Sequence, residues 1–281
     1  MSLCISYDST FDGFLSVVFE IYRQHLDVGE IRPDRIDAPC DFFLQPFRIE
    51  TTEESALRLK RAIVKYASSE ILDLLDIVFR SEEEGVEMLM LAYLRKLFDA
   101  QDPNYGRNPA SNEMLPLYTI ARSVRREAGG MLGLIRFDKT SDGVYFAEIE
   151  PKYDILPLQI GHFRGRFANE RWAIYDSRRH YGVYYDGHAS MEIHIPDMER
   201  VRANTKPDAF VRLWQEYYES ISIKERENPK LLRQNLPVRY WKHLPERNVK
   251  VTQGVVKYPT NFSMFSKNIV PNGTNNCIFS M

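Results

Sequence analysis

Between residues 129 and 195 the apolar side chains leave helical spacing and fall into short runs separated by polar turns. Asp142-Gly143 is typical of a hairpin turn, because this pair accepts the positive φ that such turns need. Ile155–Phe167 has helical spacing and carries Pro157 in its first turn, where proline is tolerated. The runs that we predict as strands are Met131–Phe137, Val144–Ile149, Trp172–Asp176, Val183–Tyr185 and Met191–Ile195. The pattern therefore predicts a sheet of short strands crossed by one helix.

Helical patterns lie on both sides of this segment. Residues 51–128 repeat apolar side chains at helical spacing, and Met88–Phe98 is apolar nearly all round, which indicates a deeply buried helix. We predict a long helix after Pro207 and a shorter one near Pro229–Gln234. Several strands in succession, bracketed by helices, favour an α+β fold over alternating α/β units. We expect a helical N-terminal half packed on a short-stranded antiparallel sheet, with further helices at the C-terminal side.

The first 50 residues have a mixed pattern. We predict a strand at Ile5–Tyr7, a helix capped by Asp8 or Ser9, a loop over Gly29–Cys40 and a strand at Phe42–Ile49. Residues 1–247 are then expected to form one composite domain, mostly helical over 51–128 and rich in strands over 129–195. Residues 248–281 contain no acidic residue and many Asn, Ser, Thr and Gly, which is typical of a loosely attached tail.

Composition narrows the class of protein. The chain has 281 residues, of which 44% are hydrophobic and 27% charged, values that fit a folded chain with a real core. No apolar run reaches the roughly 20 residues that cross a bilayer, and the N-terminus lacks a basic start followed by an apolar stretch. We therefore expect no membrane contact and no signal peptide. Cys4, Cys40 and Cys277 are far apart, so we expect three free thiols, no metal site and a cytoplasmic location.

Charge is divided unevenly along the chain. Residues 1–120 carry 12 Lys and Arg against 21 Asp and Glu, a net charge of −9, and residues 121–281 carry 25 against 18, a net charge of +7. A basic second part suits an anionic partner such as nucleic acid. The same asymmetry also fits two parts that attract each other, or surfaces that are simply solvated. Both interpretations stay open at this point.

Arginines and aromatic residues interleave over Ile155–Arg179 and form the first candidate site. His162 and Arg166 lie four residues apart and share one stripe of the predicted helix. Guanidinium groups pair with phosphates and aromatic rings stack on bases, so this mixture suits single-stranded or flipped-out nucleic acid. The cationic candidates are Arg164, Arg166, Arg178 and Arg179. On composition alone we favour the alternative, in which the aromatics are strand core and the arginines a solvated rim.

Four carboxylates form a second candidate set. Glu148 and Glu150 point to the same face of a predicted strand, and Asp154 and Asp176 lie nearby in the sequence. Paired carboxylates can carry out acid–base chemistry or hold a metal through oxygen. We favour the structural alternative, with Asp154 as a helix cap and the two glutamates as partners of arginines.

The segment Pro237–Lys242 is a third candidate, because Arg239, Trp241 and Lys242 follow one another closely. These side chains can grip a phosphate backbone, or they can clamp the C-terminal helix onto the core through cation–π contacts. The sequence has no P-loop, no Rossmann glycine pattern and no nucleophile elbow. We therefore expect no cofactor.

The same segments resemble a bacterial family of DNA-metabolism proteins that contains a domain of unknown function. The resemblance runs from Tyr7 to Glu246 and rests on Tyr7–Leu15, Glu148–Pro151 with Asp154–Leu156, His162-Phe163 with Arg166-Phe167, Trp172–Asp176, and Ile223–Trp241. It implies a neighbouring radical-SAM protein of DNA repair or modification as the partner and, in some members, a fused uracil-DNA-glycosylase-like domain.

Two departures from the family bear on chemistry. This chain has Gly129-Gly130 where the family usually carries a His-Arg pair, so chemistry that depended on that histidine would be absent here. We expect no fused glycosylase domain after Glu246. The chain also lacks the radical-SAM cysteine cluster, so any iron–sulfur chemistry would belong to the partner.

Three functional hypotheses follow. In the favoured one, the protein is a non-catalytic module that presents DNA to a repair or modification enzyme. Its nucleic-acid-binding residues would be Arg164, Arg166, Arg178, Arg179, Arg239 and Trp241. In the second, it contacts the radical-SAM protein without binding DNA. In the third, it is an enzyme acting on a nucleobase or a DNA end, with His162 as the acid–base group, Glu150 or Asp154 orienting it and Arg166 clamping a phosphate.

Overall fold

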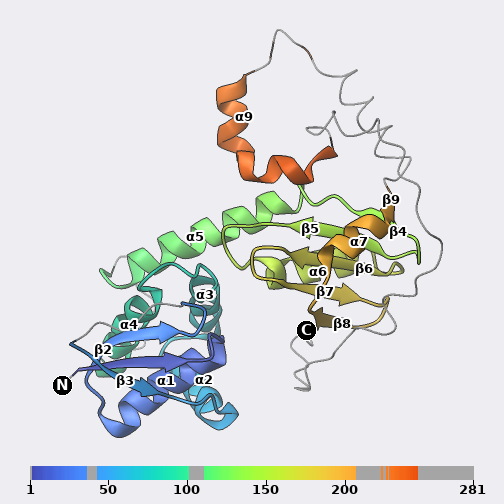
Figure 1. Ribbon diagram of the computed structural model, residues 1–281. Coiled ribbons are helices and arrows are strands. Elements are labelled where there is room, and N and C mark those ends of the chain that lie inside the picture. The colour runs from blue at the N-terminus through green and yellow to red at the C-terminus, as the bar shows by residue number, and fades with distance from the viewer. Residues whose placement is uncertain are drawn as a thin grey trace. The chain divides into compact units, whose positions relative to one another are not determined.

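The computed structural model describes residues 2–36, 43–100, 111–206, 223, 226 and 228–245 (Figure 1). The chain divides into two compact units, and the division falls between Arg126 and Glu127, inside a helix. Each unit has helices and a sheet of its own, which confirms the α+β class. The single composite domain stays a prediction, as does the packing of the helical half on the later sheet. The predicted helix after Pro207 and the tail over 248–281 lie outside the described residues.

The first unit is built on a parallel sheet in the order β2-β1-β3. Its strands and helices are β1 (Leu3–Tyr7), α1 (Phe11–Gln24), β2 (Val28–Pro33), β3 (Gln45–Arg48), α2 (Glu53–Tyr66), α3 (Ser69–Phe79), α4 (Val86–Ala100) and most of α5 (Met114–Met131). Parallel neighbours need a crossover connection, and α1 supplies it between β1 and β2. Pro46 lies in an edge strand, where a missing N–H is tolerated.

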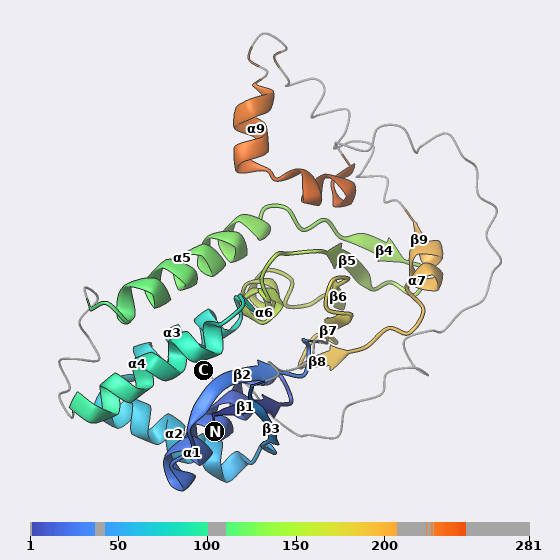
Figure 2. The same ribbon diagram turned by 60° about the vertical axis from the view of Figure 1, so that its left-hand side comes forward.

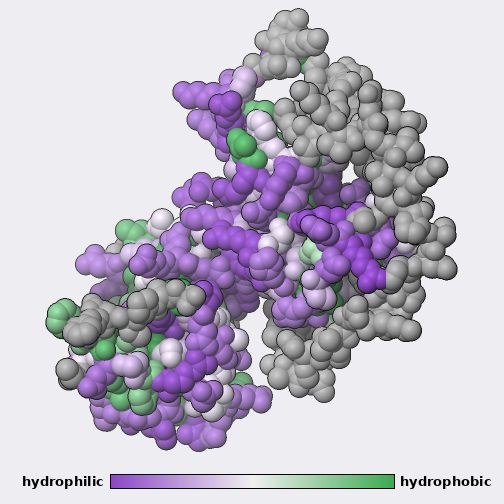
Figure 3. Space-filling view, viewed as in Figure 1, coloured by the Kyte–Doolittle hydropathy of each residue, from purple (hydrophilic) through white to green (hydrophobic). Residues whose placement is uncertain are grey.

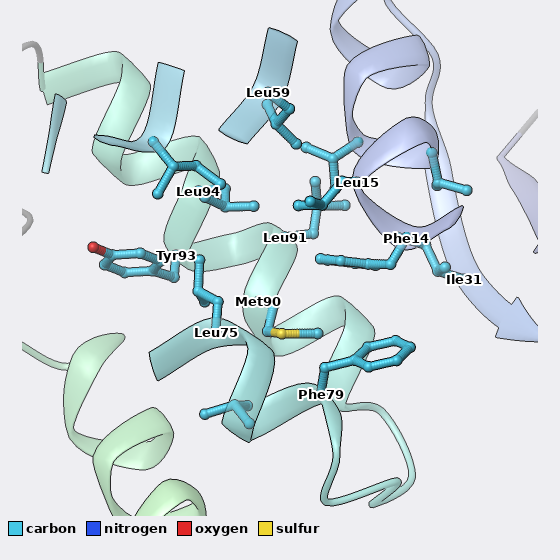
Figure 4. Packing of buried hydrophobic residues seen from close by; sticks show 14 of the residues in the cluster. Phe14, Leu15, Ile31, Leu59, Leu75, Phe79, Met90, Leu91, Tyr93 and Leu94 are labelled. Atoms are coloured by element: carbon cyan, nitrogen blue, oxygen red, sulfur yellow. The ribbon is translucent and has the colours of Figure 1, made fainter. Parts of the chain in front are cut away.

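The core of the first unit is where the helices meet. Figure 4 shows Phe14 and Leu15 of α1 close to Leu91 and Met90 of α4, with Leu59 of α2 above them, and all five side chains are buried. The helix predicted over Met88–Phe98 is present, but it is buried on one side only. Met90, Leu91, Tyr93, Leu94 and Leu97 are buried, whereas Ala92, Arg95 and Lys96 are exposed.

The turn between β1 and α1 is tightly packed. Thr10 caps α1, and not Asp8 or Ser9 as predicted, because the Thr10 hydroxyl accepts the Gly13 N–H at 2.9 Å. The Asp8 carboxylate supports this cap by accepting from the Thr10 amide and hydroxyl and from the Thr51 hydroxyl. A Cβ atom at position 13 would lie 2.1 Å from Asp8 Oδ1. Glycine at this position therefore lets the helix approach the turn.

Two further predictions for the first unit are wrong. The loop predicted over Gly29–Cys40 is wrong in its first part, because Gly29–Pro33 belong to β2, where Val28 and Ile31 are buried and pair with the central strand. Cys4 is disulfide-bonded and is therefore not a free thiol. Separation along the sequence does not measure distance in the fold, which is why spacing alone misled here. The other two cysteines lie outside the described residues.

The second unit contains a six-stranded sheet in the order β8-β7-β6-β5-β4-β9. Its elements are the end of α5, β4 (Asp138–Thr140), β5 (Tyr145–Ile149), α6 (Leu156–Arg166), β6 (Trp172–Asp176), β7 (Tyr181–Tyr185), β8 (Ser190–Ile193), α7 (Met198–Asn204), β9 (Thr205–Lys206), α9 (Pro229–Asn235) and the 3₁₀-helix η3 (Val238–His243). The predicted hairpin is confirmed, because β4 and β5 are antiparallel and Gly143 has a φ of +83°. The sheet is not wholly antiparallel, since α6 crosses over between β5 and β6 and makes them parallel.

Helices cover both faces of this sheet. Side chains alternate along β6, so Trp172 and Tyr175 face opposite sides. Trp172 stacks on Tyr185 and meets Phe163 of α6, with ring centroids 5.3 and 6.0 Å apart. Tyr175 belongs instead to a buried cluster that includes Val201 of α7. Coverage from both sides explains why all five residues of β6 are buried.

The 3₁₀-helix η3 lies beside the end of α5 and β5 in both views, and α9 extends away from them (Figures 1 and 2). Asn228 caps α9, which confirms the shorter helix predicted near Pro229–Gln234. Tyr240 and Leu244 are buried, whereas no residue of α9 is. The predicted strand over Met131–Phe137 is wrong, because α5 continues to Met131 and the next strand begins at Asp138. Among the described helices, none combines the length and apolarity needed to cross a membrane.

Candidate functional site

A pocket of about 350 Å³ lies at the carboxyl end of the parallel strands β5 and β6. It is lined by Glu150, Pro151, Lys152, Arg178 and Arg239. The first three residues follow β5 directly, Arg178 follows β6, and Arg239 belongs to η3. The carboxyl ends of parallel strands meet at one edge of a sheet, where ligands of open α/β sheets commonly bind. Three segments thus bring Lys152, Arg178 and Arg239, hereafter the pocket cations, to one cavity.

Glu127, near the end of α5, joins two sides of this pocket. Its carboxylate accepts from the backbone amides of Lys152 and Tyr153 at 3.0 and 2.8 Å. It also accepts from Arg239 Nη2 at 2.7 Å and from the Tyr240 hydroxyl. The side chain is only 7% exposed. Burial by itself raises the pKa of Glu127, but these hydrogen bonds outweigh burial and hold the pKa below its usual value, so the carboxylate is ionised.

Asp176, at the end of β6, organises the other side of the pocket. Its fully buried carboxylate accepts from the backbone amides of Arg178 and Arg179 at 2.9 and 3.2 Å, and from Arg179 Nη1 at 2.8 Å. Both guanidinium groups also donate to the Lys152 carbonyl, at 2.9 and 3.0 Å. Burial raises the pKa of Asp176 in spite of Arg179. Arg179 therefore mainly connects Asp176 to the Lys152 carbonyl, whereas Arg178 is exposed and lines the pocket.

Glu148 lies in β5 and Glu150 directly follows it, and η3 packs near this strand. Glu148 accepts two hydrogen bonds from Arg202 of α7, at 2.9 and 2.5 Å. Burial raises the pKa of Glu148, but the bonds from Arg202 reverse this and lower it overall. Glu150 forms an ion pair with Lys242, not with an arginine, and His243 Nε2 lies 3.9 Å from its Oε2. Burial lowers the pKa of His243, so this imidazole is uncharged at neutral pH.

The arginines of α6 do not line the pocket. Arg164 lies over the ring of Tyr185 and Arg166 over the ring of Phe167, with 5.8 and 5.7 Å from the guanidinium carbon to the ring centroid. Arrangements of this kind are worth about 0.5–1 kcal/mol at exposed sites. The aromatic–arginine mixture that the sequence predicted therefore exists on α6, and its contact with nucleic acid stays a prediction.

The structure does not bring His162 together with Glu150 or Asp154, the carboxylates that would orient it in the enzyme hypothesis. His162 contacts the ring of Phe163 and lies six residues into α6, about 9 Å along the axis from the start of the helix. Asp154 is not the predicted helix cap, because Ile155 occupies that position and Asp154 instead accepts from the Tyr181 hydroxyl. Within the described residues, His162 hydrogen-bonds to neither Asp154 nor Glu150. Nor do they contain a group of three His, Cys, Asp or Glu side chains placed to hold a metal ion.

Trp241 of η3 is half-buried and donates from Nε1 to the Leu236 carbonyl at 3.1 Å. It therefore links η3 to the end of α9 and supports the clamping alternative that the sequence left open. Arg239, two residues earlier, lies 4.6 Å from the Tyr240 ring centroid and still lines the pocket. Phosphate binding by Arg239 stays a prediction.

Several residues of the site were not singled out in the sequence. Glu127, Lys152 and His243 became relevant only through the fold, because Glu127 bonds to residues 112 and 113 positions later. A signal did exist for Lys152, which directly follows the candidate Glu150 at the end of a predicted strand. Hydrophilic residues also cover most of the visible face of the second unit around β5 and α7 (Figure 3).

The fold and the pocket define an α+β protein with a cationic cavity at the carboxyl end of a parallel strand pair. Residues 84–246 match the model of the DUF4130 family, described as a domain of unknown function. The match covers more than half of the chain, so the protein belongs to this family. No curated protein and no solved structure matches the chain.

Proposed function

We propose that the protein binds nucleic acid through the pocket cations and acts as an accessory protein of DNA metabolism or repair in the bacterial cytoplasm. The observation that supports this most is the convergence of three cationic side chains from distant segments on one cavity. Phosphate oxygens accept short, charge-assisted hydrogen bonds from guanidinium and ammonium groups, and such contacts supply most of the affinity of non-specific nucleic-acid binding.

The charge of the surrounding segment supports the same proposal. Residues 228–245 carry four Lys or Arg and no acidic residue. Two of the four, Arg239 and Lys242, reach the pocket or its wall, whereas Lys230 and Arg233 lie on the exposed helix α9. A basic segment beside a cationic cavity raises the local concentration of an anionic polymer.

The test is a binding measurement with charge-neutral variants. Fluorescence anisotropy with single- and double-stranded oligonucleotides at several salt concentrations gives Kd and its salt dependence. We expect the double variant Lys152→Gln, Arg178→Gln to bind more weakly. The slope of log Kd against log salt should fall by about two units, because each lost phosphate contact lowers this slope by about one unit.

Matched variants show where the contacts lie. Arg58→Gln with Arg61→Gln on α2 removes the same charge from the first unit and should leave the slope unchanged. Arg164→Gln with Arg166→Gln tests the predicted α6 surface in the same way. An unchanged slope in the pocket variant, or no binding by the wild-type protein at low salt, would refute the proposal.

From the family resemblance we also propose a radical-SAM protein as the partner. After co-expression, the two proteins should co-purify, and the complex should survive nuclease treatment if it rests on protein contacts. Loss of the complex after that treatment would leave DNA as the link. Co-purification of a protein that binds no DNA at low salt would instead establish the alternative function, a protein-interaction module.

A further inference from the structure

We propose that the pocket binds a phosphate monoester, such as the terminal phosphate of a nucleic-acid strand, in preference to the diesters inside a strand. This inference rests on the proposed nucleic-acid binding and narrows its ligand. It follows from the distribution of charge and hydrogen-bond donors around the pocket.

The pocket concentrates charge at one point. Besides the three pocket cations, Lys242 lies at the wall and neutralises Glu150, while Glu127 offsets Arg239. Four cationic groups against two carboxylates give the site a net charge of +2. A phosphate monoester carries about −1.5 to −2 at pH 7, whereas each diester carries one negative charge. The monoester is thus the better match in charge.

The donors in the pocket also suit a group with three terminal oxygens. Arg239 donates to Glu127 and Tyr240 through Nη2 alone, and Arg178 donates to the Lys152 carbonyl through Nη1 alone. Within the described chain, the other guanidinium nitrogens of these two arginines make no hydrogen bond. They can therefore reach a phosphate without giving up a contact of the fold. A monoester offers three acceptor oxygens, one more than a diester.

Two further cations near the pocket are held by contacts of the fold. Arg179 is only 10% exposed and is bound to Asp176, and Arg202 is bound by two hydrogen bonds to Glu148. Proteins that follow a single strand use a charged groove along successive phosphates. The pocket instead brings three cationic side chains to one cavity of about 350 Å³. Such an arrangement suits one compact, multiply charged group.

The experiment compares oligonucleotides of one sequence with a 5′-phosphate, a 3′-phosphate or no terminal phosphate, in anisotropy titrations of the full chain. We expect at least one phosphorylated form to bind about tenfold or more tightly than the unphosphorylated form. Inorganic phosphate and a nucleoside monophosphate serve as competitors. If the nucleotide competes as well as the phosphorylated strand, the monoester chemistry holds and a free nucleotide is its source.

Variants keep the test decisive. Arg178→Gln should remove the difference between phosphorylated and unphosphorylated strands. Glu150→Gln removes a negative charge from the pocket lining, so it should tighten monoester binding, a gain that misfolding cannot produce. Equal binding of all three strands, with a steep salt dependence that the pocket variant reduces, would overturn the monoester inference and leave the proposed function intact. Absence of binding to every strand would overturn both.

Discussion

Replacing Arg35 by Met is expected to lower the free energy of unfolding of the first unit by about 3 kcal/mol. Arg35 Nη2 donates to Glu87 Oε1 at 2.9 Å, and the Tyr7 hydroxyl donates to the same oxygen at 3.1 Å. The Glu87 side chain is only 2% exposed, so the substitution leaves a buried carboxylate with the tyrosine as its remaining partner. Burial and Glu87 raise the pKa of Tyr7, so its hydroxyl stays protonated and continues to donate. Urea denaturation followed by circular dichroism gives the difference.

Two further variants separate the buried pair from general effects of arginine removal. Arg23→Met breaks an ion pair with Glu20 in which the arginine side chain is 61% exposed, and should cost less than about 0.5 kcal/mol. The double variant Arg35→Met, Glu87→Gln removes both charges and should recover most of the lost stability, because a neutral pair carries a smaller desolvation penalty. A double variant no more stable than Arg35→Met would show that the charge of Glu87 is not the cause.

Local sequence signals predicted the elements whose causes are local. The strand Trp172–Asp176 has the predicted bounds because a short apolar run is enclosed by polar turns. Thr52 caps α2 and Asn228 caps α9, since a short polar side chain next to a free helix end needs no distant partner. The hairpin at Gly143 is likewise determined by its own residues.

Errors arose where distant contacts override local preference. Val28–Pro33 contains glycine, proline and charges and was predicted to lie mostly in a loop, yet pairing with β1 makes it a strand. A strand was predicted from Met131, but α5 continues through Gly129-Gly130 to that residue, and Gln159 Nε2 donates to the Ala128 carbonyl at 2.9 Å beside the two glycines. The sequence predicted the helix that crosses between β5 and β6, but the sheet was predicted as antiparallel, so the parallel pairing of these two strands was missed.

The candidate site was predicted in part for the same reason. Glu150, Arg178 and Arg239 were singled out separately, in three constellations, and the fold brings them to one pocket. Spacing within each segment carried no information on this meeting, because it depends on the crossover through α6 and on the docking of η3. His162 and Arg166, which the sequence joined through helical spacing, lie outside the pocket lining.

Glu127 is the residue on which the pocket should depend most. Glu127→Gln is expected to lower the free energy of unfolding of the second unit by about 2–3 kcal/mol, because four donors lose their charged acceptor. Glu170→Gln makes the same change at an exposed position and should have little effect. Oligonucleotide binding should weaken only in the first variant, because Lys152 and Arg239 then lose the group that fixes their positions.

The pH dependence of stability should identify the charge of Glu127 as the cause. Its folded pKa lies below the ordinary 4.5, so the carboxylate stabilises the folded state above that pH, and this contribution is lost as the pH falls from 4.5 through the folded pKa. Between pH 7 and pH 3, the free energy of unfolding should therefore fall more steeply with decreasing pH for the wild-type protein than for Glu127→Gln. The stabilities of the two proteins should converge in acid. A constant difference between them over this range would mean that the glutamine disturbs packing and that the ionised carboxylate does not hold the pocket together.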